Sequence, residues 1–412
     1  MGCGDLELVV NCAATTLIYF KINQITFFLL LVETTSYSSM KPGRHITIFL
    51  LTILFCSSAS AQKKGIFKKL NIDTLTNRNL RFLPLPSIIV TPETGLKGGV
   101  FVDYFYKTKA ARGKDVRPSL SWAQVLYSTR NQFTAEAYTS TYTSKEKYYI
   151  FFRGGFISNY ERYWGLTTPS VANNEYAEAT YNRVYATTRV LRNMGNKLFA
   201  GVNLYYSDYS KSKFLIKEGN AATPPPGNNN SRIGGVGFSF TADRRDNQFS
   251  PTRGFFADAT VIANYNLQNS SYAYTLMSAD VRKYNETGRH IFVNQVLFSL
   301  ATDEMPLFEK ARLGGSNLMR GFFQGRFRDN NLWALQTEYR YKLNRFLKLA
   351  VFASAGNTAP TINSIFSQQV QASGGAGLRL LINKEKKIYF RSDVAVTGNG
   401  MLGYYFRIGD AF

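Results

Sequence analysis

Polar and apolar residues alternate along much of this chain, and this pattern limits its fold more than any other feature. Leu335 and Thr337 share one face of an extended segment, while Glu338 and Arg340 share the other. A period of two with charges on one face indicates a half-buried strand. No segment after Ala61 stays apolar for the ~20 residues that a membrane-spanning helix needs. A closed β-barrel, whose alternate side chains face lipid and lumen, is the remaining way to cross a membrane.

Sixteen segments carry this alternation, which predicts an all-β fold: a transmembrane antiparallel β-barrel of about 16 strands in a bacterial outer membrane. The expected strands are 86–92, 97–107, 117–127, 131–140, 147–156, 179–190, 197–209, 232–242, 254–265, 271–284, 289–301, 331–342, 347–355, 372–382, 387–396 and 401–410. The four longest connectors follow odd-numbered strands, and several tight ones follow even-numbered strands. Because such barrels have long outer loops and short periplasmic turns, this parity places the N-terminus in the periplasm.

Residues 40–61 have the pattern of a secretory signal peptide. A charged start at Lys41 and Arg44 precedes an apolar run and a small-residue site that ends at Ala61. We expect cleavage between Ala61 and Gln62. Every cysteine of the chain lies before this cut, which excludes a disulfide scaffold and a cysteine metal site from the mature protein.

The predicted signal peptide separates residues 1–39 from the mature chain, which begins at residue 62. Residues 1–39 are explained most simply by a translation start assigned upstream of the true initiator. The rival explanation is an N-terminal anchor built on the apolar run Ile25–Val32, which is much shorter than a spanning helix. Residues 62–84 are expected to form a short periplasmic tail, too short for a folded domain, and residues 85–412 the barrel.

The chain carries a formal net charge of +22, and the excess lies after the predicted cut. A basic balance is typical of nucleic-acid binding, yet no lysine/arginine block, zinc pattern or recognition helix accompanies it. A basic lumen, or contact with anionic outer-membrane lipid and lipopolysaccharide, fits an exported chain better. The one histidine after the cut, His290, is interpreted as a surface residue. The sequence therefore predicts no enzyme, no metal site and no cofactor.

Residues 313–340 read LGGSNLMRGFFQGRFRDNNLWALQTEYR and contain Arg320-Gly321-Phe322. Other short motifs appear in order along the chain: TPETGLKGG from Thr91, ERYWG from Glu161, DRRDNQFSPTRG from Asp243, GAGLR from Gly375, and a terminal Phe412. Together these motifs resemble the BamA/TamA superfamily of outer-membrane barrels, the bacterial surface antigen family. The resemblance covers essentially all of the predicted mature chain. It implies that Arg-Gly-Phe lies at the tip of a long loop that folds into the lumen after the eleventh strand.

The resemblance also implies an acidic partner in the lumen for Arg320. In the family this acid often belongs to a Phe-x-Asp-x-Gly strand, but Ser354 occupies the aspartate position here. We therefore expect Glu338, on the inward face of the twelfth strand, to pair with Arg320, with Asp393 on the fifteenth strand as the second choice. A guanidinium and a carboxylate in a partly dehydrated lumen would form a charge-assisted pair. An exposed loop arginine is the alternative.

An aromatic C-terminal strand is similar to the signal that the barrel-assembly machinery reads during biogenesis. Tyr404, Phe406 and Phe412 would carry this signal here.

Two functions remain open at the level of sequence. The resemblance implies a barrel that inserts or translocates outer-membrane or surface proteins through a weak seam between its first and last strands. Family members usually capture clients with periplasmic POTRA domains, for which residues 62–84 leave no room, so a periplasmic partner or direct contact with client proteins would be needed. The alternative is a passive, anion-leaning channel or a structural surface barrel.

Overall fold

The computed structural model describes residues 16–22, 25–31, 82–106, 108, 117, 119–166, 176–216, 229–268, 272–384 and 387–412. The chain divides into two units, Met1–Asn71 and Ile72–Phe412. In the first unit, β1 (Thr16–Ile22) pairs antiparallel with β2 (Ile25–Leu31), which includes most of the apolar run considered above as an anchor. The expected cleavage site at Ala61 and Gln62 lies outside the described residues. None of the helices described is long and apolar enough to cross a membrane.

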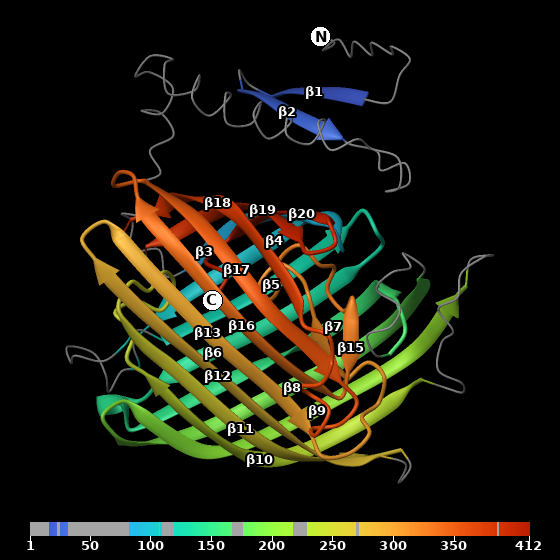
Figure 1. Ribbon diagram of the computed structural model, residues 1–412. Helices are drawn as coiled ribbons and strands as arrows, with labels where there is room; N and C mark the ends of the chain where they lie inside the picture. The colour runs from blue at the N-terminus through green and yellow to red at the C-terminus, as the bar shows by residue number, and fades with distance from the viewer. Residues whose placement is uncertain are drawn as a thin grey trace, which may run out of the picture. The chain divides into compact units, whose positions relative to one another are not determined.

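The second unit is a closed antiparallel barrel of sixteen strands (Figure 1). In order around the sheet they are β3 (Phe82–Thr91), β4 (Gly95–Tyr106), β5 (Ser119–Ser128), β6 (Phe133–Tyr142), β7 (Tyr148–Tyr163), β8 (Ala177–Gly195), β9 (Leu198–Leu215), β10 (Ser231–Asp243), β11 (Gly254–Asn266), β12 (Ala273–Thr287), β13 (His290–Ala301), β16 (Asn331–Lys342), β17 (Leu347–Ala359), β18 (Gln371–Asn383), β19 (Ile388–Thr397) and β20 (Leu402–Ile408). Each corresponds to one of the sixteen predicted segments, which confirms the predicted fold class.

Alternate burial along the strands explains why these sequences form a barrel. On β10, Val236, Phe238 and Phe240 are each more than half exposed, and the residues between them are more buried. On β16, Leu335 is 45% exposed while Glu338 is fully buried. Apolar side chains on the outer face and polar side chains on the inner face are what a barrel in lipid requires.

Strands β7, β8 and β9 are considerably longer than the sequence pattern predicts. Their extensions pair with one another, as in Tyr163↔Ala177 and Glu178↔Leu215. Aromatic side chains of these extensions pack around Phe308, which comes from the connection after β13. Because the extensions pack against a distant loop, local alternation does not mark where the strands end.

The first and last strands of the barrel, light-blue β3 and red β20 in Figure 1, meet along a poorly paired seam. Strands β3 and β20 share one registered pair, Phe406↔Val90. Every other pair of neighbouring barrel strands shares between seven and sixteen. The expected short first strand at 86–92 is instead the ten-residue β3, which contains Pro84 and Pro86. Each proline lacks the N–H that a sheet ladder uses.

The β13–β16 loop (residues 302–330) is the long connection that contains the Arg-Gly-Phe motif. It includes a short antiparallel pair of its own, β14 (Ala311–Leu313) and β15 (Phe327–Asp329). Most of its side chains from Met305 to Asn330 are buried. The loop is therefore packed against the barrel rather than extended into solvent.

Candidate functional site

Arg320 lies at the tip of the β13–β16 loop and is completely buried. Its Nη1 donates to Asp393 Oδ2 at 2.7 Å, and its Nη2 donates to Glu338 Oε2, also at 2.7 Å. The guanidinium also stacks 3.4 Å above the centre of the Phe352 ring. The structure thus brings together Arg320 and both acids that the sequence suggested for it.

These two acids are in place because their strands alternate. Glu338 on β16 and Asp393 on β19 occupy buried positions between more exposed neighbours. The strands β17 and β18 separate them in the sheet, and Arg320 reaches across both. Because each carboxylate has no exposed surface, it needs several donors to offset the loss of water.

Two further arginines supply such donors, and a third adds positive charge nearby. Arg379 on β18 contacts both acids, and Arg340 donates through Nε to Glu338 Oε1 at 2.7 Å. Arg391 lies 3.6 Å from Asp393. Arg340 also donates to Asp410 Oδ2 at 2.8 Å.

We call this group of Arg320, Glu338, Arg340, Arg379, Arg391, Asp393 and Asp410 the arginine network. It sets four guanidiniums against three carboxylates, an excess of one positive charge. No role was predicted from the sequence for Arg340, Arg379, Arg391 or Asp410. Two of them had a usable signal: Arg340 shares the period-two face of Glu338, and Arg379 ends the GAGLR motif.

Gly321 and Phe322 shape the tip of the loop beside Arg320. Gly321 adopts a φ of +111°, and a Cβ there would lie 2.9 Å from Thr397 Cγ2. The hydroxyl of Tyr405 accepts from the Gly321 backbone N–H at 2.9 Å and donates to the Phe322 carbonyl at 3.4 Å. The Phe322 side chain is buried in an apolar cluster with Phe327 and other residues of the loop and β16.

Ser354 stands where the family often has an aspartate, and it supports the loop in a different way. Its hydroxyl donates to Gln336 Oε1 at 3.2 Å. The same Gln336 oxygen accepts from the backbone N–H of Met319, next to Arg320, at 3.1 Å. A neutral polar bridge thus replaces an acid on β17.

The aromatic residues expected to form an assembly signal occupy two different environments. Tyr404 and Phe406 lie on β20, whereas Phe412 lies beyond the end of that strand. Phe412 is 5% exposed and packs with Tyr284, Ile291 and other buried residues of β12 and β13.

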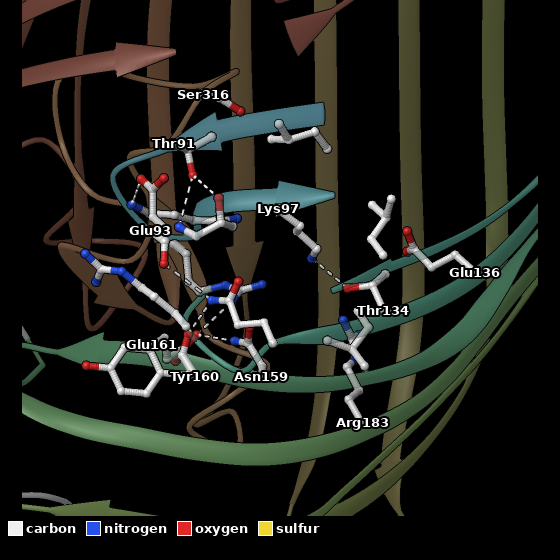
Figure 2. Close-up of a pocket in the computed structure, with 18 of the residues that line it drawn as sticks. Thr91, Glu93, Lys97, Thr134, Glu136, Asn159, Tyr160, Glu161, Arg183 and Ser316 are labelled. Atoms are coloured by element: carbon white, nitrogen blue, oxygen red, sulfur yellow. Dashed lines mark hydrogen bonds and ion pairs between the residues drawn. The ribbon is translucent and has the colours of Figure 1, made fainter. Parts of the chain in front are cut away.

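A polar cavity of about 600 Å³ lies between the β13–β16 loop and strands of the opposite wall (Figure 2). Seven cationic side chains line it, against the three acids Glu93, Glu136 and Glu161. Two of these acids are paired directly: Glu136 with Arg153 and Glu161 with Arg312 and Arg328. The cavity therefore has a clear excess of positive charge.

Burial shifts the pKa of two charged side chains in the loops around this cavity. Burial raises the pKa of the Glu93 carboxyl, although hydrogen bonds from Thr91 and from the Gln324 backbone N–H oppose the rise. Burial, together with the nearby charge of Arg162, lowers the pKa of Arg326 to about 10.

The described residues offer little for catalysis or metal binding. Among them, no group of three or more His, Cys, Asp or Glu residues is placed to hold a metal ion. His290 lies at the start of β13, where its exposed ring is hydrogen-bonded to the Tyr339 hydroxyl at 2.7 Å.

Comparison with known proteins places this geometry in a family. The Omp85 superfamily domain matches residues 112–412. Among solved structures, BamA from Haemophilus ducreyi lacking POTRA domains 1–3 superposes with a TM-score of 0.53 at 11% identity, over 80% of this chain and 70% of that chain. CdiB from Escherichia coli superposes with a TM-score of 0.54 at 10% identity, over 80% of this chain and 63% of that chain. CdiB from Acinetobacter baumannii superposes with a TM-score of 0.51 at 12% identity, over 80% of this chain and 59% of that chain.

These likenesses establish the fold alone, because the identities are so low. This chain also spans less than two thirds of either CdiB chain. A search of curated proteins returns no match.

Proposed function

Because this chain belongs to the Omp85 superfamily, we propose that it acts in the insertion or translocation of outer-membrane or surface proteins. It is an outer-membrane β-barrel, and members of this superfamily are assembly and transport proteins rather than enzymes. Its exposed apolar side chains would contact outer-membrane lipid and lipopolysaccharide. Its clients, and any periplasmic partner, would be proteins that reach the barrel from the periplasm.

The seam between β3 and β20 is the observation that carries this proposal. Its one registered pair contrasts with at least seven at every other junction of the barrel. Backbone N–H and C=O groups left unpaired at a strand edge are a template for another strand. An incoming client segment could pair with this edge at little cost, because few hydrogen bonds must first be broken.

The β13–β16 loop would occupy the lumen in this proposal. The fully buried Arg320, held by two carboxylates, is an anchor that a solvent-exposed loop would not need. A loop held there would limit the passage of solutes while the seam remains the site of action.

A disulfide across the seam tests the proposal directly. Residues 57–412 contain no cysteine, so a V90C/F406C double variant would introduce one defined pair at the registered position. The matched control is V394C/Y404C, which links β19 to β20 at an already paired position. Each variant is expressed in cells that lack the native gene, and outer-membrane proteins are quantified under oxidising and reducing conditions.

We expect deletion of the gene to deplete a small set of barrels or surface proteins. Wild type and V394C/Y404C should restore them, and V90C/F406C should restore them only when reduced. An unchanged protein profile on deletion, or full rescue by the oxidised seam variant, would refute the proposal.

A passive anion-leaning channel is the second candidate, and the excess of cations in the cavity favours it. In planar bilayers, this function requires anion-selective conductance that rises when residues 313–328 are deleted. Absence of conductance in both the wild type and the variant that lacks residues 313–328 would exclude the channel function.

A further inference from the structure

Three cations form a row across the seam. Arg391 of β19 lies directly opposite Arg407 of β20 in the strand register. The single registered pair of the seam places Arg407 beside Ile89 of β3, and Ile89 pairs with Lys97 of β4. Lys97 and Arg407 therefore flank the seam on opposite sides, and both line the cavity described above.

Neither Lys97 nor Arg407 has a carboxylate within salt-bridge distance in the described part of the chain, and their positive charges repel each other. The acids that act on them from farther away are engaged elsewhere. Glu136 is paired with Arg153, and Glu93 accepts from a backbone N–H of the β13–β16 loop. The positive charges of Lys97 and Arg407 are therefore not balanced by an ion pair in the described part of the chain.

A hydroxyl accompanies each of these cations. Lys97 Nζ donates to Thr134 Oγ1 at 2.7 Å, as Figure 2 shows, and Arg407 Nη1 donates to Ser316 Oγ at 2.5 Å. Because each hydroxyl accepts from the cation, its own O–H remains to donate to a third group. Both hydroxyls line the same cavity as the cations.

We propose that Lys97, Arg407, Thr134 and Ser316 bind a phosphate-class oxyanion inside the barrel at the seam. The backbones of β4 and β20 are two strand spacings apart, about 10 Å, which long lysine and arginine side chains can span around one oxyanion. Guanidinium, ammonium and hydroxyl donors suit tetrahedral anionic oxygens. A cavity of about 600 Å³ accommodates such an anion together with water.

The occupied site would strengthen the seam. Lys97 and Arg407 carry like charges on the two strands that flank β3, and an oxyanion shared by them replaces that repulsion with a bridge between β4 and β20. This inference concerns a ligand and not a client protein. A barrel that fails to bind oxyanions and still supports outer-membrane assembly would overturn it without affecting the proposed function.

The test is a calorimetric titration of the purified, refolded barrel in neutral detergent with inorganic phosphate at constant ionic strength. The variants are Lys97→Gln and Arg407→Gln, with Lys97→Arg as the charge-preserving variant. Lys283→Gln on β12 is the matched control, because Lys283 is exposed and does not line the cavity. Heat-modifiable migration on gels verifies that each variant is folded.

A second arm distinguishes free phosphate from a lipid phosphate. The same proteins are placed in nanodiscs of phosphatidylcholine with or without phosphatidic acid, and the thermal stability of the barrel is measured. Stabilisation by phosphatidic acid without binding of inorganic phosphate would identify a lipid phosphomonoester as the source.

We expect saturable one-site binding, weakened roughly tenfold to a hundredfold by either glutamine variant, which is the usual effect of losing a hydrogen bond to a charged group. Lys97→Arg and Lys283→Gln should bind like wild type. Unchanged affinity in folded Lys97→Gln and Arg407→Gln, or no saturable effect in either arm, would overturn the proposal.

Discussion

Removal of Glu338 should destabilise the barrel more than removal of Arg320, although the two residues form one ion pair. Arg320→Met removes two charge-assisted hydrogen bonds, which contribute roughly 1.5–3 kcal/mol each. Both acids keep Arg379 as a partner, and the arginine network becomes neutral. We therefore place the loss near the lower bound of that sum, at about 3 kcal/mol.

Glu338→Gln instead leaves three buried guanidiniums without the carboxylate that they share. The network then carries an excess of two positive charges. Breaking a buried ion pair from one side costs roughly 3–5 kcal/mol, and the three affected arginines argue for the upper end. The Arg320→Met/Glu338→Gln double variant returns to an excess of one charge, so its loss should fall below the sum of the single losses.

The assay is equilibrium unfolding by urea of the barrel in detergent micelles, followed by tryptophan fluorescence and gel migration. Arg253→Met is the control, because Arg253 pairs with Glu286 while its own side chain is 69% exposed, and such pairs contribute about 0–1 kcal/mol. An Arg320→Met loss equal to or larger than that of Glu338→Gln would refute the charge-balance reasoning. A loss of stability in the double variant equal to the sum of the two single losses would also refute this reasoning. A simple charge swap between Arg320 and Glu338 should not restore stability, because an arginine at 338 would face Arg340 and Arg379.

Three further predictions follow from single contacts. Gly321→Ala should cost about 1–3 kcal/mol, because its φ is strained for alanine and the new Cβ meets Thr397; unchanged unfolding and unchanged protease resistance of the loop would contradict this. Burial raises the folded-state pKa of Glu93, so its contribution to stability is fully present below the unfolded value, near pH 4, and is lost as the pH rises through the folded value. Glu93→Gln should remove this decline in unfolding experiments between pH 4 and 8, and an identical pH profile would count against it. A polar tag after Phe412 should lower the yield of assembled barrel, because Phe412 is buried against β12 and β13; equal yield with and without the tag would show that this packing is dispensable.

Agreement between sequence and structure is closest where a local rule governs the residue. Each of the sixteen strands was predictable because lipid outside and polar groups inside impose a period of two on every short segment. The same rule placed Glu338 on the buried face of its strand. It could not detect the extensions of β7–β9, since aromatic residues there, such as Phe214 on β9, pack against Phe308 from a loop about a hundred residues away.

The arginine network shows where local reasoning stops. Arg320 joins Glu338 and Asp393, which are 18 and 73 positions away in the sequence. The sequence suggested the two acids as alternatives, and the structure places both against the same guanidinium. Arg391 and Asp410 had no sequence signal, because a charged residue on an inward face looks the same whether it meets water or another charge.

By itself, then, the sequence determined the barrel, the number of its strands and the loop that carries Arg320, because alternation and turn chemistry act over a few residues. Only the tertiary structure decided which charges meet, how little β3 pairs with β20, and that Lys97 and Arg407 share one cavity. Those features depend on where the sheet closes on itself. Closure brings together residues from both ends of the barrel, and their distance in space has no counterpart in their distance along the chain.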